Sequence, residues 1–127
     1  MTARLIVDGN NVMGSRPDGW WRDRARATVR LVGQLGAWAA SRQEDLLVVF
    51  DGSPPAQLDG VERVEVRFAQ RRGRDAADDV IATLVAADSA PASLRVVTSD
   101  AALAARVRSA GAEVIGAGRF RDQLDDA

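Results

Sequence analysis

The chain has 127 residues, of which 46% are hydrophobic and 28% are charged, and its formal net charge is −1. This length and balance suit a single domain over residues 1–127, and the near-neutral charge excludes a broadly basic surface that would bind nucleic acid without specificity. Because the chain contains neither cysteine nor histidine, disulfides, thiol chemistry and the usual zinc ligands are excluded, and any metal must be held by oxygen.

The first predicted element is a short strand at residues 4–7, in the stretch RLIVDGNNV. Its three consecutive apolar residues are too few for a signal peptide or a membrane span, so we expect a cytoplasmic protein without membrane contact. Further apolar runs predict strands at 45–50, 61–68, 94–98 and 112–115, and one-sided apolar patterns predict helices at about 22–41, 75–88 and 101–110.

The alternation of these strands and helices predicts an α/β fold. Continuous apolar strands separated by helices are typical of a three-layer architecture, here a mainly parallel sheet of about five strands flanked by helices. The strand at 61–68 is the exception, because a loop containing Pro54 and Pro55 leads into it where a helix would be expected.

Acidic side chains follow several of the predicted strands. Asp8 ends the first strand, Asp51 ends the second and Asp100 follows the fourth. Since ligands of such sheets bind outside the carboxyl ends of the strands, these carboxylates should meet at one edge. Asp78 and Asp79 join them from the first turn of the helix after the third strand. Repulsion between carboxylates in such a cluster raises their pKa values or requires a counter-cation. Mg²⁺ or Mn²⁺ is the natural partner.

Several of these candidate residues, and their neighbours, can also be interpreted as ordinary members of turns or as helix caps. The residues with this second interpretation are Asp8 with Gly9 and Asn10, Asn11, Asp51 with Gly52, Asp75, Thr98, Ser99 and Asp100. For Asp75 the helix cap is the favoured role. The helical period places Asp78 closer than Asp79 to the apolar face, which favours Asp78 as the inward ligand.

Two groups of cationic residues are candidates for contact with a nucleic-acid backbone. All 17 cations are arginines. One cluster lies within 22–30, and the other, Arg71, Arg72 and Arg74, directly precedes the acidic helix. Guanidinium groups bind phosphate, so the second cluster is predicted to hold a phosphodiester backbone, although a solvated loop explains it nearly as well. The pair Trp20 and Trp21 could stack on bases, but tryptophans before a long helix favour a core or staple role.

Four stretches together resemble a known family: VDGNNV (7–12), VVFDG (48–52), DAADDVI (75–81) and VVTSD (96–100). In this order and at these strand ends they resemble the NYN domains of the PIN-like nucleases, most closely the YacP-like branch, over nearly the whole chain. The resemblance implies a metal-dependent ribonuclease, an endoribonuclease, in which Asp8, Asp78 and Asp100 ligate Mg²⁺ or Mn²⁺.

The resemblance assigns roles to further residues and partners. Asn11 matches the asparagine of the Asp-Gly-x-Asn signature and Thr98 a supporting hydroxyl that we group with the substrate-binding residues. Asp51 matches a further acidic position of the catalytic set, and Asp79 is expected beside the metal. The resemblance also implies RNA as a partner, and the ribosome or the translation machinery as a further one. The C-terminal helical extension in which the branch often continues is not expected here, because the sequence stops at Ala127 shortly after RFRDQLDD, so contacts made by that extension are not carried over.

Other functions of acidic strand ends fit less well. A phospho-accepting receiver domain and a haloacid-dehalogenase-type phosphatase both use a lysine, which this chain lacks. A dinucleotide-binding turn would follow the first strand, whereas GAGRF (116–120) is incomplete and lies near the C-terminus. The alternative that remains is a non-catalytic RNA- or protein-binding module on the same fold. Without histidine, cysteine or lysine, phosphodiester hydrolysis would need a metal to activate water.

Overall fold

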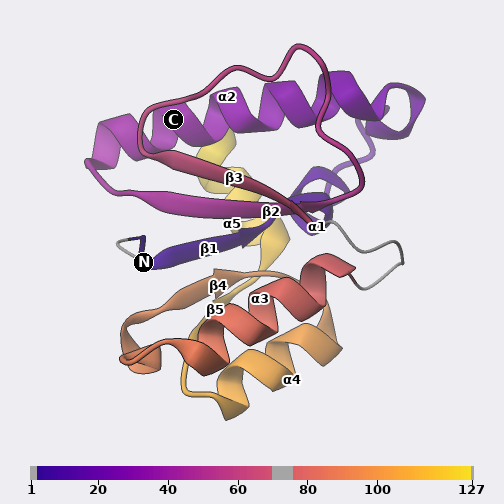
Figure 1. Cartoon of the computed structure of the whole chain (residues 1–127). Coiled ribbons are helices and arrows are strands. Elements are labelled where there is room, and N and C mark those ends of the chain that lie inside the picture. The colour runs from indigo at the N-terminus through magenta and orange to yellow at the C-terminus, as the bar shows by residue number, and fades with distance from the viewer. Residues whose placement is uncertain (1–2, 70–75, 127) are drawn as a thin grey trace.

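The computed structural model shows a five-stranded parallel sheet between two layers of helices (Figure 1). It describes residues 3–69 and 76–126. The strands are β1 (Leu5–Asp8), β2 (Leu46–Asp51), β3 (Val64–Ala69), β4 (Arg95–Val97) and β5 (Glu113–Ile115). They lie in the order β3-β2-β1-β4-β5, and each neighbouring pair is parallel. The predicted three-layer α/β fold with a parallel sheet is confirmed.

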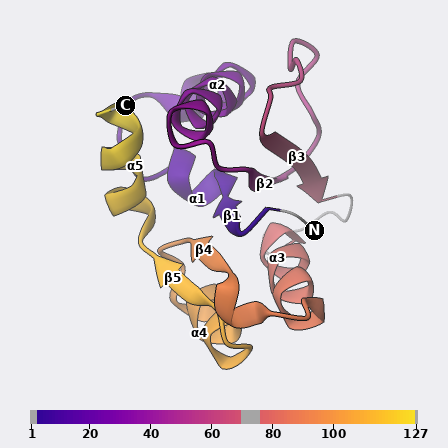
Figure 2. The same cartoon turned by 90° about the vertical axis from the view of Figure 1, so that its left-hand side faces the viewer.

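Five α-helices cover the two faces of this sheet (Figure 2). They are α1 (Gly9–Met13), α2 (Arg24–Arg42), α3 (Ala76–Ala87), α4 (Ala101–Ser109) and α5 (Ala117–Asp125), and short 3₁₀ helices lie at η1 (Trp20–Arg22) and η2 (Pro91–Ser93). Helices α1, α2 and α5 contribute to the core on one face, and α3 and α4 to the core on the other. None of the helices in the described part of the chain is long and apolar enough to span a membrane.

Two of these helices, α1 and α5, were not predicted. The interpretation of Asp8 with Gly9 and Asn10 as a strand-to-loop turn is wrong, because α1 begins at Gly9 directly after β1. A helix of five residues is too short to show an apolar period. Helix α5 buries Ala117, Phe120, Arg121 and Leu124, but only Phe120 and Leu124 are large apolar residues, too few for the apolar run by which the longer helices are predicted.

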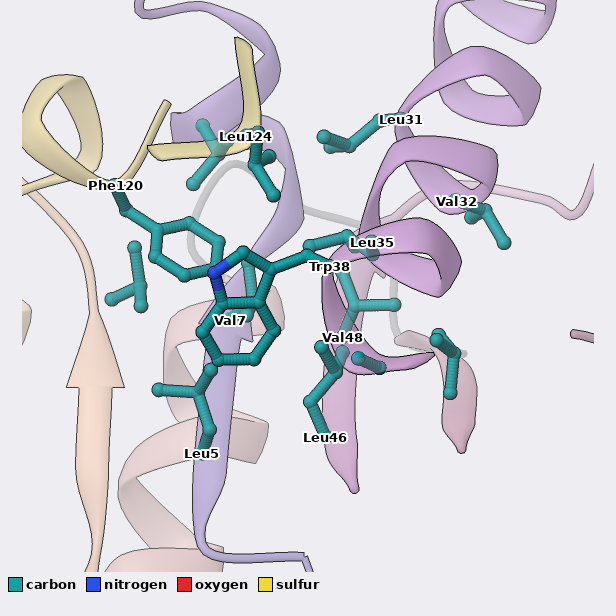
Figure 3. Close-up of a cluster of buried hydrophobic side chains, with 14 of the residues drawn as sticks. Leu5, Val7, Leu31, Val32, Leu35, Trp38, Leu46, Val48, Phe120 and Leu124 are labelled. Atoms are coloured by element: carbon teal, nitrogen blue, oxygen red, sulfur yellow. The ribbon is translucent and has the colours of Figure 1, made fainter. Parts of the chain in front are cut away.

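The unbroken apolar run of β1 follows from burial on both faces of the sheet. Leu5 and Val7 point into the core beneath α2 and α5, whereas Ile6 points into the core beneath α3 and α4. On the α2 side, Trp38 packs edge-on against Phe120, with ring centroids 5.3 Å apart (Figure 3). A strand buried on both faces cannot alternate apolar and polar residues, which is why this stretch reads as continuously hydrophobic.

Strand β3 lies at the edge of the sheet and is reached without a helix. It begins at Val64, three residues later than predicted, and its exposed Glu65 and Arg67 alternate with more buried residues. In the preceding connection, Val61 packs against α2 at Gly36, where a Cβ atom would lie 2.3 Å from the Val61 Cγ1 atom. The connection therefore crosses the α2 layer by close contact with a glycine of that helix.

The strand order places β1 beside β4, although the two are distant in the sequence. The chain moves from β1 to β2 and β3 on one side, and β4 and β5 lie on the other side of β1. In open α/β sheets, the point where the strand order reverses opens a crevice at the carboxyl ends of the strands. Here that point lies at the carboxyl ends of β1 and β4.

Candidate functional site

Asp8 lies at this reversal point as the last residue of β1, and only 4% of it is exposed. The Thr98 hydroxyl, which follows β4, donates a hydrogen bond of 2.9 Å to the Asp8 Oδ2 atom. A backbone N–H from Asn11 in α1 also supports the carboxylate. Asp8 is therefore a buried carboxylate whose orientation is set by groups from two other segments.

Burial raises the pKa of Asp8 to about 6, because the charged form loses its contact with water. The hydrogen bond from Thr98 and the backbone N–H of Asn11 oppose this rise, whereas the nearby carboxylates of Asp78 and Asp51 add to it. Asp78 and Asp51 are thus each close enough to Asp8 to repel its charge. The arrangement favours a cation near Asp8, since a positive charge would offset both the cost of removing the carboxylate from water and the repulsion from the neighbouring acids.

The two asparagines of α1 connect this helix to the neighbouring strand ends. The Asn10 Oδ1 atom accepts a hydrogen bond of 2.7 Å from the backbone N–H of Asp51, at the end of β2. The Asn11 Oδ1 atom accepts one of 2.7 Å from the backbone N–H of Ser99, after β4. Asn11 was among the predicted site residues, and Asn10 was considered only as part of a turn. Adjacent asparagines favour a turn in the sequence, and only the strand order shows that each reaches a different strand.

Asp51 links the end of β2 to the start of α3. Its Oδ1 atom accepts a hydrogen bond of 2.8 Å from the backbone N–H of Ala77, in the first turn of α3. Asp51 thereby satisfies a donor of the helix terminus and draws the turn that carries Asp78 toward the sheet edge. The predicted cap for this helix, Asp75, lies outside the described residues.

Each residue of the Thr-Ser-Asp stretch after β4 makes hydrogen bonds of its own. Thr98, 1% exposed, donates to Asp8 and accepts a bond of 3.1 Å from the backbone N–H of Asp100. The Ser99 Oγ atom accepts a bond of 2.8 Å from the first N–H of α5, at Ala117. Asp100 caps α4 through its Oδ1 atom, as its structural interpretation predicted. Because the Thr98 hydroxyl is buried and engaged, we assign to it the positioning of Asp8 in place of substrate contact.

The remaining predicted residues have different surroundings. Asp79 forms an ion pair of 2.9 Å with Arg106 of α4, on a partly exposed surface. Within residues 3–69 and 76–126, no group of three or more acidic side chains is arranged so that it could hold a metal ion. The predicted arginines, Arg71, Arg72 and Arg74, lie outside the described residues.

A pocket of about 250 Å³ lies beside the acidic edge. Asn10 and Asp51 line one part of it, and Arg24 and Thr28 from the first turns of α2 line another. Phe68 of β3 also contributes to the lining. The pocket thus joins residues of the acidic edge to the arginine-rich start of α2.

Comparisons with known proteins agree with this architecture. The family model of the YacP-like NYN domain matches residues 5–127. A crystal structure of Rae1 (YacP) from Bacillus subtilis superposes with a TM-score of 0.79 at 24% identity, covering 99% of this chain and 75% of that chain. A crystal structure of its W164L mutant superposes with a TM-score of 0.76 at 25% identity, covering 96% and 74% of the two chains. No curated protein sequence matched this chain.

Proposed function

Because the chain belongs to the family of YacP-like NYN domains, which is nuclease-like, we propose that it is a metal-dependent endoribonuclease acting at the carboxyl ends of β1 and β4. The observation that carries this proposal is the buried carboxylate of Asp8, whose pKa is raised to about 6 by burial and by neighbouring acids. A buried carboxylate with a raised pKa, at the point where the strand order of the sheet reverses, is typical of a site that binds a charged ligand.

The donor set suits Mg²⁺ or Mn²⁺. The candidate ligands offer only oxygen, and the repulsion that Asp78 and Asp51 exert on Asp8 is the kind that a hard divalent cation relieves. We assign Asp8, Asp78 and Asp100 to the ion, with Asp79 beside it. Because these carboxylates are not already gathered into a metal site in the described residues, the assignment requires that the bound ion draws them together. When bound, such an ion supplies Lewis acidity toward a phosphate and makes a water molecule more acidic.

The protein's own groups would orient this chemistry. Thr98 and the backbone N–H of Asn11 hold the Asp8 carboxylate in one orientation. Asp51 holds the first turn of α3, and with it Asp78, against the sheet edge. We further propose that RNA is the substrate and that Arg71, Arg72 and Arg74 bind its backbone. We also propose that the protein acts on this RNA at the ribosome or the translation machinery.

The proposal is tested by incubating the purified protein with labelled single-stranded and structured RNAs in Mg²⁺, in Mn²⁺ and in EDTA. We expect cleavage at internal positions with either ion and none with chelator. Cleavage that continues undiminished in EDTA, by protein shown to be free of contaminating nuclease, would overturn metal dependence. RNA that is bound but remains intact with both ions would instead support the non-catalytic binding module.

The Asp78→Asn variant tests the acidic site directly, because it removes one charge and nearly keeps the shape. We expect cleavage to fall on the order of 100-fold or more and the thermal stabilisation gained on adding Mn²⁺ to decrease. The matched control is Asp59→Asn, at an exposed acid of the connection between β2 and β3, which should behave as the wild type. Equal activity and equal Mn²⁺ response in the two variants would contradict the assignment of Asp78.

A further inference from the structure

Trp21 differs from the other large hydrophobic residues of the described chain because it is exposed. It lies on η1, and 51% of its surface is accessible to solvent. Its neighbour Trp20 packs against the core beneath α2, and the two rings meet edge-on with centroids 5.9 Å apart. Trp20 therefore packs against the core, as predicted for tryptophans before a long helix, whereas the Trp21 ring faces solvent.

The segment that carries Trp21 is held in place by a buried arginine. Arg121 of α5, with a side chain only 9% exposed, forms an ion pair of 2.9 Å with Asp18. Asp18 in turn accepts a bond of 3.2 Å from the backbone N–H of Trp20. Arg121 also donates a bond of 3.3 Å to the carbonyl of Val12 in α1. Trp21 is thus presented from a segment tied to the helix that carries the site asparagines.

One cationic group lies over the Trp21 ring, and a second lies over the neighbouring Trp20 ring, nearer the acidic edge. The Arg22 guanidinium lies 5.9 Å from the Trp21 ring centroid, and the Arg24 guanidinium lies 5.7 Å from that of Trp20. Arg24 also lines the pocket that contains Asn10 and Asp51. An exposed aromatic face, two guanidinium groups and the acidic edge therefore follow one another across one part of the surface.

We propose that Trp21 stacks on a base of single-stranded RNA while Arg24 contacts the adjoining backbone, so that the strand runs from η1 over the pocket to the acidic edge. This inference rests on the proposed function, whose substrate it specifies as a single strand. Every base offers a π-face to an aromatic ring, and a guanidinium beside it suits a phosphate. A duplex keeps its base faces stacked inside, so it cannot use the Trp21 ring in this way.

Binding to a fluorescently labelled ten-nucleotide oligouridine in EDTA, measured by anisotropy, tests the proposal apart from cleavage. Trp21→Ala should weaken binding about 5- to 100-fold, and Trp21→Phe should retain part of the affinity. Trp21→Ala should leave the slope of log affinity against log salt unchanged, because no counterion is involved. Arg24→Gln should flatten that slope by about 0.7. Arg108→Gln, at an exposed position of α4 on the other face of the sheet, is the matched control.

A second measurement uses the wild-type protein and does not depend on how the variants fold. An oligomer of the same length without bases should bind the wild type more weakly, by about the factor seen for Trp21→Ala with oligouridine. Trp21→Ala should then cause no further loss on the base-free oligomer. Two results would overturn stacking. One is that removing the bases and replacing Trp21 by alanine weaken binding by factors that multiply in full. The other is that Trp21→Ala weakens binding to a blunt RNA duplex as much as binding to oligouridine.

The two proposals fail in different ways. If Trp21→Ala binds oligouridine as tightly as the wild type while the wild type still cleaves RNA with Mn²⁺, the stacking site is wrong and the nuclease proposal stands. If no RNA is cleaved under any metal condition while Trp21→Ala loses affinity, the stacking site stands without the nuclease.

Discussion

Replacing Asp8 by asparagine should change the pH dependence of stability in a defined direction. The pKa of Asp8 is raised from its ordinary value of 3.8 to about 6, chiefly by burial. The folded state therefore holds this proton more tightly than the unfolded state does. The resulting stabilisation is fully present below pH 3.8 and is lost as the pH rises through about 6.

The size of this effect follows from the two pKa values. A difference of about two pKa units corresponds to about 3 kcal/mol in the free energy of unfolding. Asparagine cannot ionise, and its amide oxygen can still accept the bond from Thr98. In EDTA, Asp8→Asn should equal the wild type in stability below pH 4 and exceed it by about 3 kcal/mol at pH 7.

Urea denaturation in EDTA at a series of pH values from about 2 to 8 measures this difference. Asp88→Asn is a control of opposite sign, because the Arg4 guanidinium holds the pKa of Asp88 at about 2. That variant should be less stable than the wild type at neutral pH, and the difference should vanish as the pH falls through about 2. Stability curves of Asp8→Asn and the wild type that remain parallel from pH 4 to 7 would refute the reasoning.

Two further predictions concern the elements that position the site. Asn10→Ala should lower the free energy of unfolding by about 1–3 kcal/mol, because the N–H of Asp51 loses its partner; a loss below 0.5 kcal/mol in urea denaturation would contradict this. Gly9→Ala should cost about 1–3 kcal/mol by overpacking, since its Cβ atom would lie 2.4 Å from the Phe50 Cε1 atom. Gly33→Ala, with no heavy atom within 4 Å of its Cβ position, should instead raise the thermal midpoint, and equal midpoints for the two glycine variants would contradict the packing argument.

Local periodicity was sufficient to predict the central elements of the fold. The strands around Leu5, Leu47 and Val96 are buried on both faces, so their apolar runs are unbroken and easy to recognise. The long helix α2 and the helix α3 each bury one face, which leaves a clear period of 3.6 residues. Helix α1 has only five residues, and α5 carries only two large apolar side chains, Phe120 and Leu124, so neither has the long run of spaced apolar residues by which α2 and α3 are predicted.

The sequence also predicted the residue types of the candidate site, because ligands of an α/β sheet bind at the carboxyl ends of the strands and an acid there indicates a possible ligand contact. It could not say which acids approach one another. Asp8 and Asp51 end strands that pair directly, whereas Asp78 comes near Asp8 because the Ala77 N–H at the start of α3 donates a hydrogen bond to Asp51. Asp100 is used to cap α4, a contact that the sequence offered only as an alternative.

What the sequence determined by itself is therefore local: the apolar periods, the strand ends that carry carboxylates, and an oxygen-only set of candidate ligands. Tertiary structure decided the contacts between segments far apart in the chain. The bond between Thr98 and Asp8 joins residues 90 positions apart and exists only because β4 pairs with β1. The partial burial of Trp20 and the exposure of Trp21 were decided in the same way, since adjacent tryptophans are equivalent until α2 and the core determine which ring packs inward.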